Sequence, residues 1–193
     1  MIEAKGVVPS SLPFPHASMT ALVSSSDADA LLAWMEKEAP WRLRIESFYE
    51  QYEFSLLSAP PPSDLAWLTS ETSVKALEDL IRASLGADGK LELVDISAHR
   101  LVEGQTIRVH NDFIGDLETH RVLLQLNRGW SVDNGGILML FGSDRPEDVR
   151  AAIIPQHGSA FVFEISPQSF HAVSTIRGGD RFTLVYTFRM LMA

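Results

Sequence analysis

Three side chains in the second half of the chain, His110, Asp112 and His171, are of the types that bind a transition metal. Successive side chains of an extended strand point to opposite faces, so His110 and Asp112, two residues apart, are expected on the same face. With His171 they would offer two imidazoles and one carboxylate to one side of an ion and leave three coordination positions open. That donor set is typical of non-haem Fe(II) oxygenases.

Arg181 and Thr183 form a second group with chemical potential. They are two residues apart at the start of an expected strand and therefore share one face. A guanidinium fork beside a hydroxyl is suited to a carboxylate. His120 is a rival metal ligand, but it lies in a polar stretch that we expect to form a mobile loop. The sequence thus predicts a metal site and a separate carboxylate site.

Short strands separated by tight turns should carry these side chains. The expected strands cover 91–101, 106–112, 121–127, 136–141, 151–154, 159–165, 171–176 and 181–190. Two turn sequences, 133–136 and 177–180, place glycine where positive φ is needed. This pattern predicts a mainly β fold with flanking helices, a double-stranded β-helix of the jelly-roll, cupin-like type with N-terminal helices buttressing one sheet.

Two helices are expected before this region. The first should begin with Ser26 as its N-cap and end before Pro40. The second should run from about Ser70 to Leu85, with Gly86 as its stop. Residues 41–57, between them, alternate apolar and polar side chains and predict a strand.

We expect the chain to be one domain over residues 1–193. Residues 1–25 contain several prolines among serines and predict an extended leader, packed on the surface or partly disordered. Residues 26–90 would then support a jelly-roll core at 91–190. No internal repeat and no second domain are indicated.

The composition narrows the function classes. A formal net charge of -9 argues against a nucleic-acid partner, because such proteins need clustered Lys and Arg to displace counterions from phosphates. The chain has no cysteine, which excludes disulfides and zinc-thiolate sites and fits a reducing compartment. No apolar run is long enough to span a bilayer and no signal peptide is evident. We therefore expect a cytoplasmic protein with no membrane partner, while the oligomeric state stays open.

Alternation along the strands predicts which side chains line a pocket. Arg108 is on the metal-facing side of its strand, so a cation should lie beside the metal. The polar face of the next strand carries Arg121 and Asn127 and should line the cavity. Trp130 follows, as rim, core packing or a stacking surface. The candidate substrate contacts are therefore Arg108, Arg121, Asn127 and Trp130.

Several ordered motifs join these positions. They are Gly104 six residues before His110, Gln125-Leu126-Asn127 followed by Trp130, Gly135-Gly136, Phe163-Glu164-Ile165-Ser166-Pro167, Ser169-Phe170-His171, and Gly179-Asp180-Arg181-Phe182-Thr183. On these motifs residues 95–190 resemble the Fe(II)- and 2-oxoglutarate-dependent dioxygenases, specifically the prolyl 4-hydroxylase-like branch. The segment is similar to ribosomal-protein prolyl hydroxylases.

The resemblance implies Fe(II) as cofactor, with 2-oxoglutarate and O2 as cosubstrates. It implies these iron ligands: His110, Asp112 and His171. It also implies that Arg181 pairs with the distal carboxylate of 2-oxoglutarate and that Thr183 hydrogen-bonds it. The implied reaction hydroxylates an unactivated C–H bond and releases succinate and CO2.

Three positions depart from the family pattern. Many relatives have tyrosines nine and three residues before the first histidine and just before the Leu-Asn pair, and here these positions are Leu101, Ile107 and Gln125. The changes remove phenols that commonly line the pocket, and we take Gln125 as a cosubstrate contact. Asp112 favours hydroxylation over halogenation, because halogenating relatives replace that carboxylate with a small residue.

Several alternatives remain open. The substrate could be a free amino acid or biosynthetic intermediate, or a peptidyl residue such as proline. The runner-up function is a noncatalytic jelly-roll module that binds or senses a metal or small acid. A zinc hydrolase or isomerase using the same three ligands is a third, although the motif offers no general base. His99 and His157 are expected at the surface or in turns, and Arg100 has no evident partner.

Overall fold

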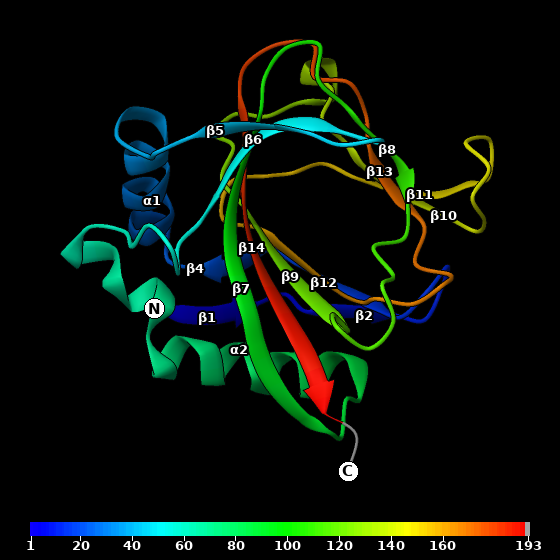
Figure 1. The fold of residues 1–193 in the computed structure, drawn as a ribbon, viewed down its shortest axis with the longest axis horizontal. Coiled ribbons are helices and arrows are strands. Elements are labelled where there is room, and N and C mark those ends of the chain that lie inside the picture. The colour runs from blue at the N-terminus through cyan, green and yellow to red at the C-terminus, as the bar shows by residue number, and fades with distance from the viewer. Residues whose placement is uncertain (192–193) are drawn as a thin grey trace.

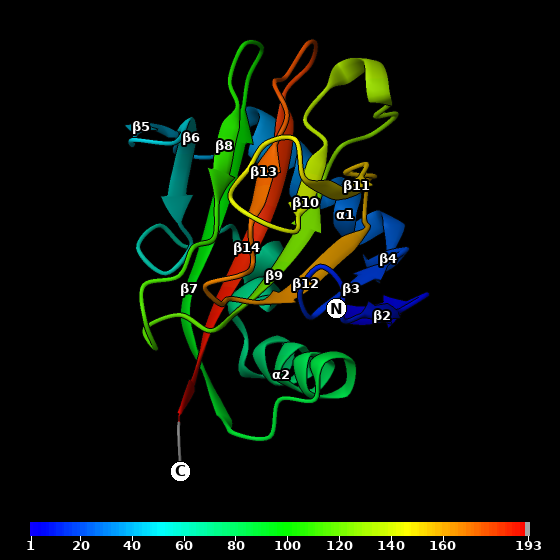
Figure 2. The ribbon, with the colours of Figure 1, turned by 90° about the vertical axis from the view of Figure 1, so that its right-hand side faces the viewer.

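The structure, a computed structural model, describes residues 1–191, and its centre is a pair of facing antiparallel sheets (Figure 1). Eight strands form this core: β7 (Lys90–Leu101), β8 (Ile107–His110), β9 (His120–Gln125), β10 (Leu138–Phe141), β11 (Val149–Ile153), β12 (Ala160–Glu164), β13 (His171–Val173) and β14 (Arg181–Leu191). One sheet contains β12-β9-β14-β7 and the other contains β11-β10-β13-β8. Figure 2 shows the smaller sheet face on. The eight predicted strands and the double-stranded β-helix are confirmed.

The N-terminal segment extends the larger sheet. It contains β1 (Ile2–Lys5), β2 (Val8–Ser10), β3 (His16–Met19) and β4 (Ala21–Val23). Strand β3 pairs with β12 and β2 pairs with β3, while β1 and β4 form a separate ribbon. Ala17 and Leu22 are fully buried. The predicted surface leader is therefore wrong: the backbone is extended, but pairing with a distant strand makes the segment part of the sheet and core.

A hairpin replaces the single strand predicted at 41–57. Strand β5 (Arg42–Ile45) turns into β6 (Glu50–Ser55), and the Glu46 N–H donates to the Tyr49 carbonyl at 2.8 Å within the turn. Strand β6 pairs with β7, so the larger sheet reaches eight strands in the order β2-β3-β12-β9-β14-β7-β6-β5. The hairpin places β6 along one wall of the space between the sheets.

The helices begin and end where local chemistry allows. Helix α2 (Glu71–Leu85) is capped by the Ser70 hydroxyl, which accepts from the Ser73 N–H at 3.2 Å, and it ends at Gly86 with φ 74°. Helix α1 (Ser25–Lys37) is capped by Ser24, not by the predicted Ser26, because Ser24 has the extended backbone that an N-cap needs. Two short 3-10 helices are η1 (Ser63–Thr69) and η2 (Val132–Asn134). Among residues 1–191, no helix combines the length and apolar character needed to cross a membrane.

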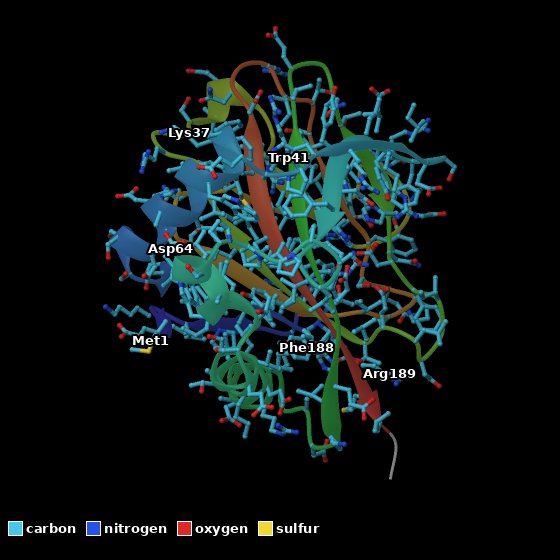
Figure 3. The ribbon with its side chains drawn as sticks, turned by 60° about the vertical axis from the view of Figure 1, so that its left-hand side comes forward. Met1, Lys37, Trp41, Asp64, Phe188 and Arg189 are labelled. Carbon is cyan, nitrogen blue, oxygen red and sulfur yellow. The ribbon has the colours of Figure 1, made fainter. Side chains whose placement is uncertain are left out.

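Two apolar layers hold the sheets in place. The first lies between the larger sheet and the helices, where Leu31 of α1 and Leu77 of α2 pack against the outer face of β14 and its neighbours. Figure 3, with the helices brought forward, shows side chains filling this layer. The second lies between the two sheets and includes Leu140 and Phe163. Each fully buried side chain of this size contributes about 2 kcal/mol. The two layers fix the sheets on either side of one inner cavity.

Strand β14 shows how the cavity acquires its polar wall. Its apolar face, which includes Leu184 and Tyr186, belongs to the helix-side layer, as alternation predicts. The opposite face, with Arg181, Thr183 and Thr187, lines the cavity. The packing of one face therefore determines the direction of the other.

Candidate metal centre and carboxylate site

Two strands of the smaller sheet bring the predicted metal ligands together. Strand β8 ends at His110, β13 begins at His171, and the two residues are direct partners in the antiparallel pair. Nε2 of His110 lies 3.2 Å from one Asp112 carboxylate oxygen, and Nε2 of His171 lies 3.1 Å from the other. One donor atom from each of the three residues lies within 4.8 Å of the others. The arrangement matches the two-imidazole, one-carboxylate set expected from the sequence.

Asp112 lies in a turn after the strand, and not on the strand face that alternation predicted. Strand β8 stops at His110, so the expected strand 106–112 is too long at its end. Asp112 has φ 59°, in the left-handed region that Asp and Asn enter more readily than most residues. The Asn111 carbonyl Oδ1 accepts from the Phe113 N–H at 3.1 Å and stabilises the bend. A local turn therefore aims the carboxylate at the imidazoles.

Backbone carbonyls set the orientation of both imidazoles. Nδ1 of His110 lies 2.9 Å from the Arg108 carbonyl, and Nδ1 of His171 lies 2.7 Å from the Ser169 carbonyl. A carbonyl can only accept, so each Nδ1 carries the proton and each Nε2 presents a lone pair. Such bonds fix the tautomer and direction of metal-binding histidines. Both rings are thus prepared to donate to a cation beside Asp112.

Arg121 is the cation that compensates Asp112. One guanidinium nitrogen donates to Asp112 Oδ2 at 2.7 Å, and the other donates to Glu118 at 2.7 Å. Burial alone would raise the pKa of Asp112, but the charge of Arg121 holds it well below the usual value. The Asp112 carboxylate therefore stays ionised, with Oδ2 occupied by Arg121.

Arg108, the cation predicted at this place, lies elsewhere. Its guanidinium donates to the Ser47 carbonyl near the exposed edge, and it does not line the cavity. The pairing of β8 with β13 has a register irregularity between Ile107 and His110, so simple alternation does not hold at Arg108. The structure does not place Arg108 in the cavity lining, where it was expected, and Arg121 lies beside the ligands instead.

Arg181 forms the second part of the site, at the start of β14. Its side chain is 4% exposed, and it donates to Thr183 Oγ1 at 2.9 Å and to Gln125 Oε1 at 3.2 Å. Nε has no partner, and no carboxylate of residues 1–191 pairs with the guanidinium. Burial lowers the pKa of Arg181 to about 10. The site is a buried positive charge held by neutral oxygens, which suits an anionic ligand.

Gly136 leaves room for the Arg181 side chain because it has no Cβ. A Cβ on Gly136 would come within 2.9 Å of Arg181 Cδ and 2.7 Å of Ile176 Cδ1. The backbone at Gly136 also has φ 63°, which L side chains rarely adopt. The glycine predicted from the turn sequence thus serves close packing against the arginine as well as the turn.

One cavity of about 590 Å³ connects the two groups. Its lining includes the three candidate metal ligands together with Arg181 and Thr183. Apolar side chains from both sheets, among them Leu123 and Val173, also line the cavity. A ligand in this space could touch a bound metal at one end and the Arg181 guanidinium at the other.

His99 is a cavity residue that the sequence interpretation missed. It was expected at the surface or in a turn, but it lines the cavity from β7, with Nε2 3.1 Å from the Ser97 hydroxyl. Burial is the main cause that lowers the pKa of His99 to about 4, so the ring is neutral near pH 7. Alternation could have predicted this position, because Asp95, Ser97 and His99 form the polar face of the expected strand 91–101.

Two other predicted substrate contacts serve the fold. Asn127 is buried outside this cavity, donating to the Pro155 carbonyl at 3.0 Å and accepting from the Phe182 N–H at 2.7 Å. Trp130 donates its indole N–H to the Gly135 carbonyl at 2.9 Å and packs beside Gly136, away from the cavity lining. Both predictions are corrected, because strand β9 ends at Gln125 and the chain then leaves the cavity face.

Further expectations outside the cavity also change. His120 is buried at the start of β9, in contact with the Thr119 hydroxyl at 2.8 Å, and is part of a strand and not of a mobile loop. Arg100 does have a partner, Asp180, whose carboxylate lies 2.5 Å away.

Comparison with known proteins connects this site to a family. Residues 96–189 match the family model described as the 2OG-Fe(II) oxygenase superfamily. Prolyl 3-hydroxylase OGFOD1 of Xenopus laevis is 29% identical over 178 residues, covering 86% of this chain and 32% of that protein. The same protein of Mus musculus is 29% identical over 176 residues, covering 85% of this chain and 30% of that one. The chain therefore spans about a third of these curated relatives.

Solved structures share the fold. A Pseudomonas putida prolyl-4-hydroxylase superposes with a TM-score of 0.71 at 20% identity, over 92% of this chain and 93% of that chain. A Trichoplax adhaerens prolyl hydroxylase, in complex with a hypoxia-inducible-factor peptide fragment, gives 0.69 at 15% identity over 86% and 78%. With the family match, these findings give the class that the chain resembles: residues 96–189 match the 2OG-Fe(II) oxygenase superfamily, and the chain shares the fold of the two prolyl hydroxylases.

Proposed function

We propose that this chain is an Fe(II)- and 2-oxoglutarate-dependent dioxygenase that hydroxylates an unactivated C–H bond. The observation that carries the proposal is the pairing of opposite sites in one cavity. His110, Asp112 and His171 offer lone pairs and a negative charge at one end, and Arg181 offers a buried positive charge at the other. A metal ion and a dicarboxylic oxoacid would satisfy both.

The donor set fits Fe(II). Two neutral imidazoles and one carboxylate on the same side leave coordination positions for ligands that are not protein. Bound Fe(II) with 2-oxoglutarate and O2 supplies the oxidation of a C–H bond to an alcohol, as 2-oxoglutarate becomes succinate and CO2. His110, Asp112 and His171 would hold the iron.

The carboxylate site fits 2-oxoglutarate. A buried guanidinium without a counter-charge carries a desolvation cost that an incoming carboxylate offsets. Arg181 would pair with the distal carboxylate. The Thr183 hydroxyl, which here donates to Gln125 Oε1 at 3.1 Å, would turn to donate to that carboxylate. Gln125 replaces the tyrosine of many relatives and keeps the Arg181 fork in place with its side-chain carbonyl.

Other residues of the chain prepare the site. Arg121 holds Oδ2 of Asp112, which leaves Oδ1 directed toward the His110 ring. The carbonyls of Arg108 and Ser169 hold the rings in a metal-binding tautomer.

For the substrate, we propose a peptidyl residue such as proline, with a small amino acid or biosynthetic intermediate as the alternative. The support is the activity named for the relatives, prolyl 3-hydroxylase and prolyl 4-hydroxylase. The cytoplasmic location and the lack of a nucleic-acid or membrane partner stay predictions from the sequence.

Anaerobic titration tests the cofactor assignment. Fe(II) and 2-oxoglutarate together, but neither alone, should produce a weak visible absorption band. Admission of O2 should then give succinate in proportion to 2-oxoglutarate consumed. Tight binding of both ligands without succinate would contradict the catalytic proposal and favour a noncatalytic binding module.

A further inference from the structure

Two polar side chains on β6 face the cavity without a role in the metal or oxoacid sites. Gln51 and Glu53 are two residues apart and both line the cavity. Gln51 is 3% exposed, and its amide nitrogen donates to a Glu53 oxygen at 2.7 Å. The Gln51 carbonyl Oε1 is buried, and no donor among residues 1–191 bonds to it. A buried acceptor left without a donor costs about 1–3 kcal/mol, so its presence beside a carboxylate points to a ligand that donates.

The charges of the cavity lining also favour a ligand that donates hydrogen bonds. The charged side chains of its lining are three arginines and five carboxylates: Arg44, Arg121, Arg181, Glu46, Glu53, Asp95, Asp112 and Glu118. The formal balance is therefore -2, and Fe(II) with the 2-oxoglutarate dianion would leave it unchanged. Low-dielectric cavity walls strengthen such a field. A cationic ligand is favoured over an anionic one.

The arginines are already engaged. Arg121 is shared by Asp112 and Glu118, and Arg181 is the anion site for the oxoacid. Arg44 contacts Glu53 at 3.0 Å, but it is more than half exposed and also pairs with Glu46. Solvent therefore screens its effect on Glu53. No cation in the cavity lining is left to bind a substrate carboxylate.

The strand beside Glu53 adds no positive charge. His99 of β7 is the register partner of Glu53 and lines the same wall. Burial lowers the pKa of His99 to about 4, so its ring is neutral at physiological pH. The wall built by β6 and β7 is thus an acceptor surface.

We propose that Gln51 and Glu53 form a subsite for a cationic group of the substrate, an ammonium or a guanidinium. The cation would donate N–H groups to Gln51 Oε1 and to the Glu53 carboxylate. The net charge of -9 on the chain would draw such substrates toward the cavity. This inference rests on the proposed dioxygenase function and names the charge class of its substrate.

Matched probes test the subsite by turnover. Lysine and arginine amides, and prolyl tripeptides with lysine beside proline, are each compared with isosteres in which norleucine or citrulline replaces the charged residue. Cationic probes should raise 2-oxoglutarate consumption above the substrate-free rate by at least about tenfold more than their neutral partners. Equal stimulation by the neutral isosteres would overturn the proposal.

The variant Glu53→Gln assigns the effect to a residue. It should lower kcat/KM for the cationic probes by about tenfold or more, and leave the neutral isosteres unchanged. Glu103→Gln removes an exposed carboxylate outside the cavity lining and is the matched control. Gln51→Leu should lower cation affinity by a smaller factor. Melting temperatures show whether each variant folds, and an equal loss with both probe classes would contradict the subsite.

Equilibrium binding separates this inference from the proposed function. The same probes are titrated by NMR into protein loaded with Mn(II) and 2-oxoglutarate in the absence of O2. Selective binding of cations that Glu53→Gln removes would support the subsite even if no succinate forms, and only the dioxygenase proposal would then fail. Binding without charge selectivity would overturn the subsite whether or not turnover occurs.

Discussion

The two ends of the cavity carry buried charges of opposite sign, and among residues 1–191 only one of these charges has an oppositely charged partner. At the metal end, Asp112 is a buried anion surrounded by two imidazoles and by Arg121, at 3.2, 3.1 and 2.7 Å. At the oxoacid end, Arg181 is a buried cation whose side-chain hydrogen bonds within residues 1–191 go to the neutral oxygens of Thr183 and Gln125. The first end is compensated before any ligand arrives, and the second is not.

The backbone that carries each end differs as well. Asp112 lies after the end of β8 with a left-handed backbone, whereas Arg181 and Thr183 lie on the long strand β14 between β7 and β9. A loop-borne anion needs ion pairs to hold its direction, while a strand-borne cation is positioned by the sheet. Local interactions therefore maintain the metal end, and sheet packing maintains the oxoacid end.

The largest expected effect is the loss of the metal end itself. Asp112→Asn keeps the shape and tolerates φ 59°, but removes the charge that binds a cation. Turnover and Fe(II) affinity should each fall by more than about a hundredfold, since even outer partners of metal ligands cost ten- to a hundredfold. Metal content after dialysis and succinate formation measure the two effects. Asp116→Asn, in the same loop, is the control, and near-normal metal binding by Asp112→Asn would refute the ligand role.

The second effect concerns the uncompensated cation. Arg181→Met should raise the KM for 2-oxoglutarate by about a hundredfold, because charge-assisted bonds to the carboxylate are lost. It should leave Mn(II) affinity unchanged. The melting temperature of the free protein should not fall, because the variant removes a buried charge that has no counter-charge. A marked drop in stability without ligands would show that this end is compensated after all.

The third effect is smaller and tests the compensation of Asp112. Arg121→Gln should weaken Mn(II) binding by about ten- to a hundredfold, since Asp112 loses the partner that orients it. The free variant should also be less stable, because removal of one partner leaves a buried charge unpaired. Thermal unfolding with and without Mn(II) measures both. Arg128→Gln, which breaks an exposed ion pair with Asp29, is the control and should change neither quantity.

The smallest expected effect is a pH dependence of stability from two histidines, His99 and His120. The folded-state pKa of His99 and of His120 is lowered to about 4, chiefly by burial, against a usual value of 6.5. Between these values the unfolded chain binds more protons, so the free energy of unfolding is full above about pH 6.5 and falls as pH decreases toward 4. The slope reaches about 1.4 kcal/mol per pH unit for each histidine.

Urea unfolding of His120→Gln across this pH range measures the dependence. The variant should lose about half of the slope that the two residues produce. His157→Gln, whose ring is bonded to the exposed Asp29, is the control and should keep the wild-type slope. An unchanged slope in His120→Gln would mean that the ring is protonated in the folded protein.

The sequence by itself determined the strand core and the residue types of both sites. Alternation along 181–190 fixed which side chains of β14 pack against the helices, because one face is wholly apolar. The Ser70 cap and the Gly86 stop likewise fixed α2, since both depend on neighbours within one turn. Local periodicity and capping are short-range effects, and short-range effects can be read from sequence.

Only the tertiary structure decided which polar residues meet in the cavity. It paired His110 with His171 across β8 and β13, brought Arg121 to Asp112 and moved Arg108 outward. It also placed His99 inside the cavity, where a surface position was expected. These outcomes depend on register between distant strands, on the left-handed turn at Asp112 and on the pairing of β6 with β7. Such contacts join residues far apart in the chain, so no local pattern specifies them.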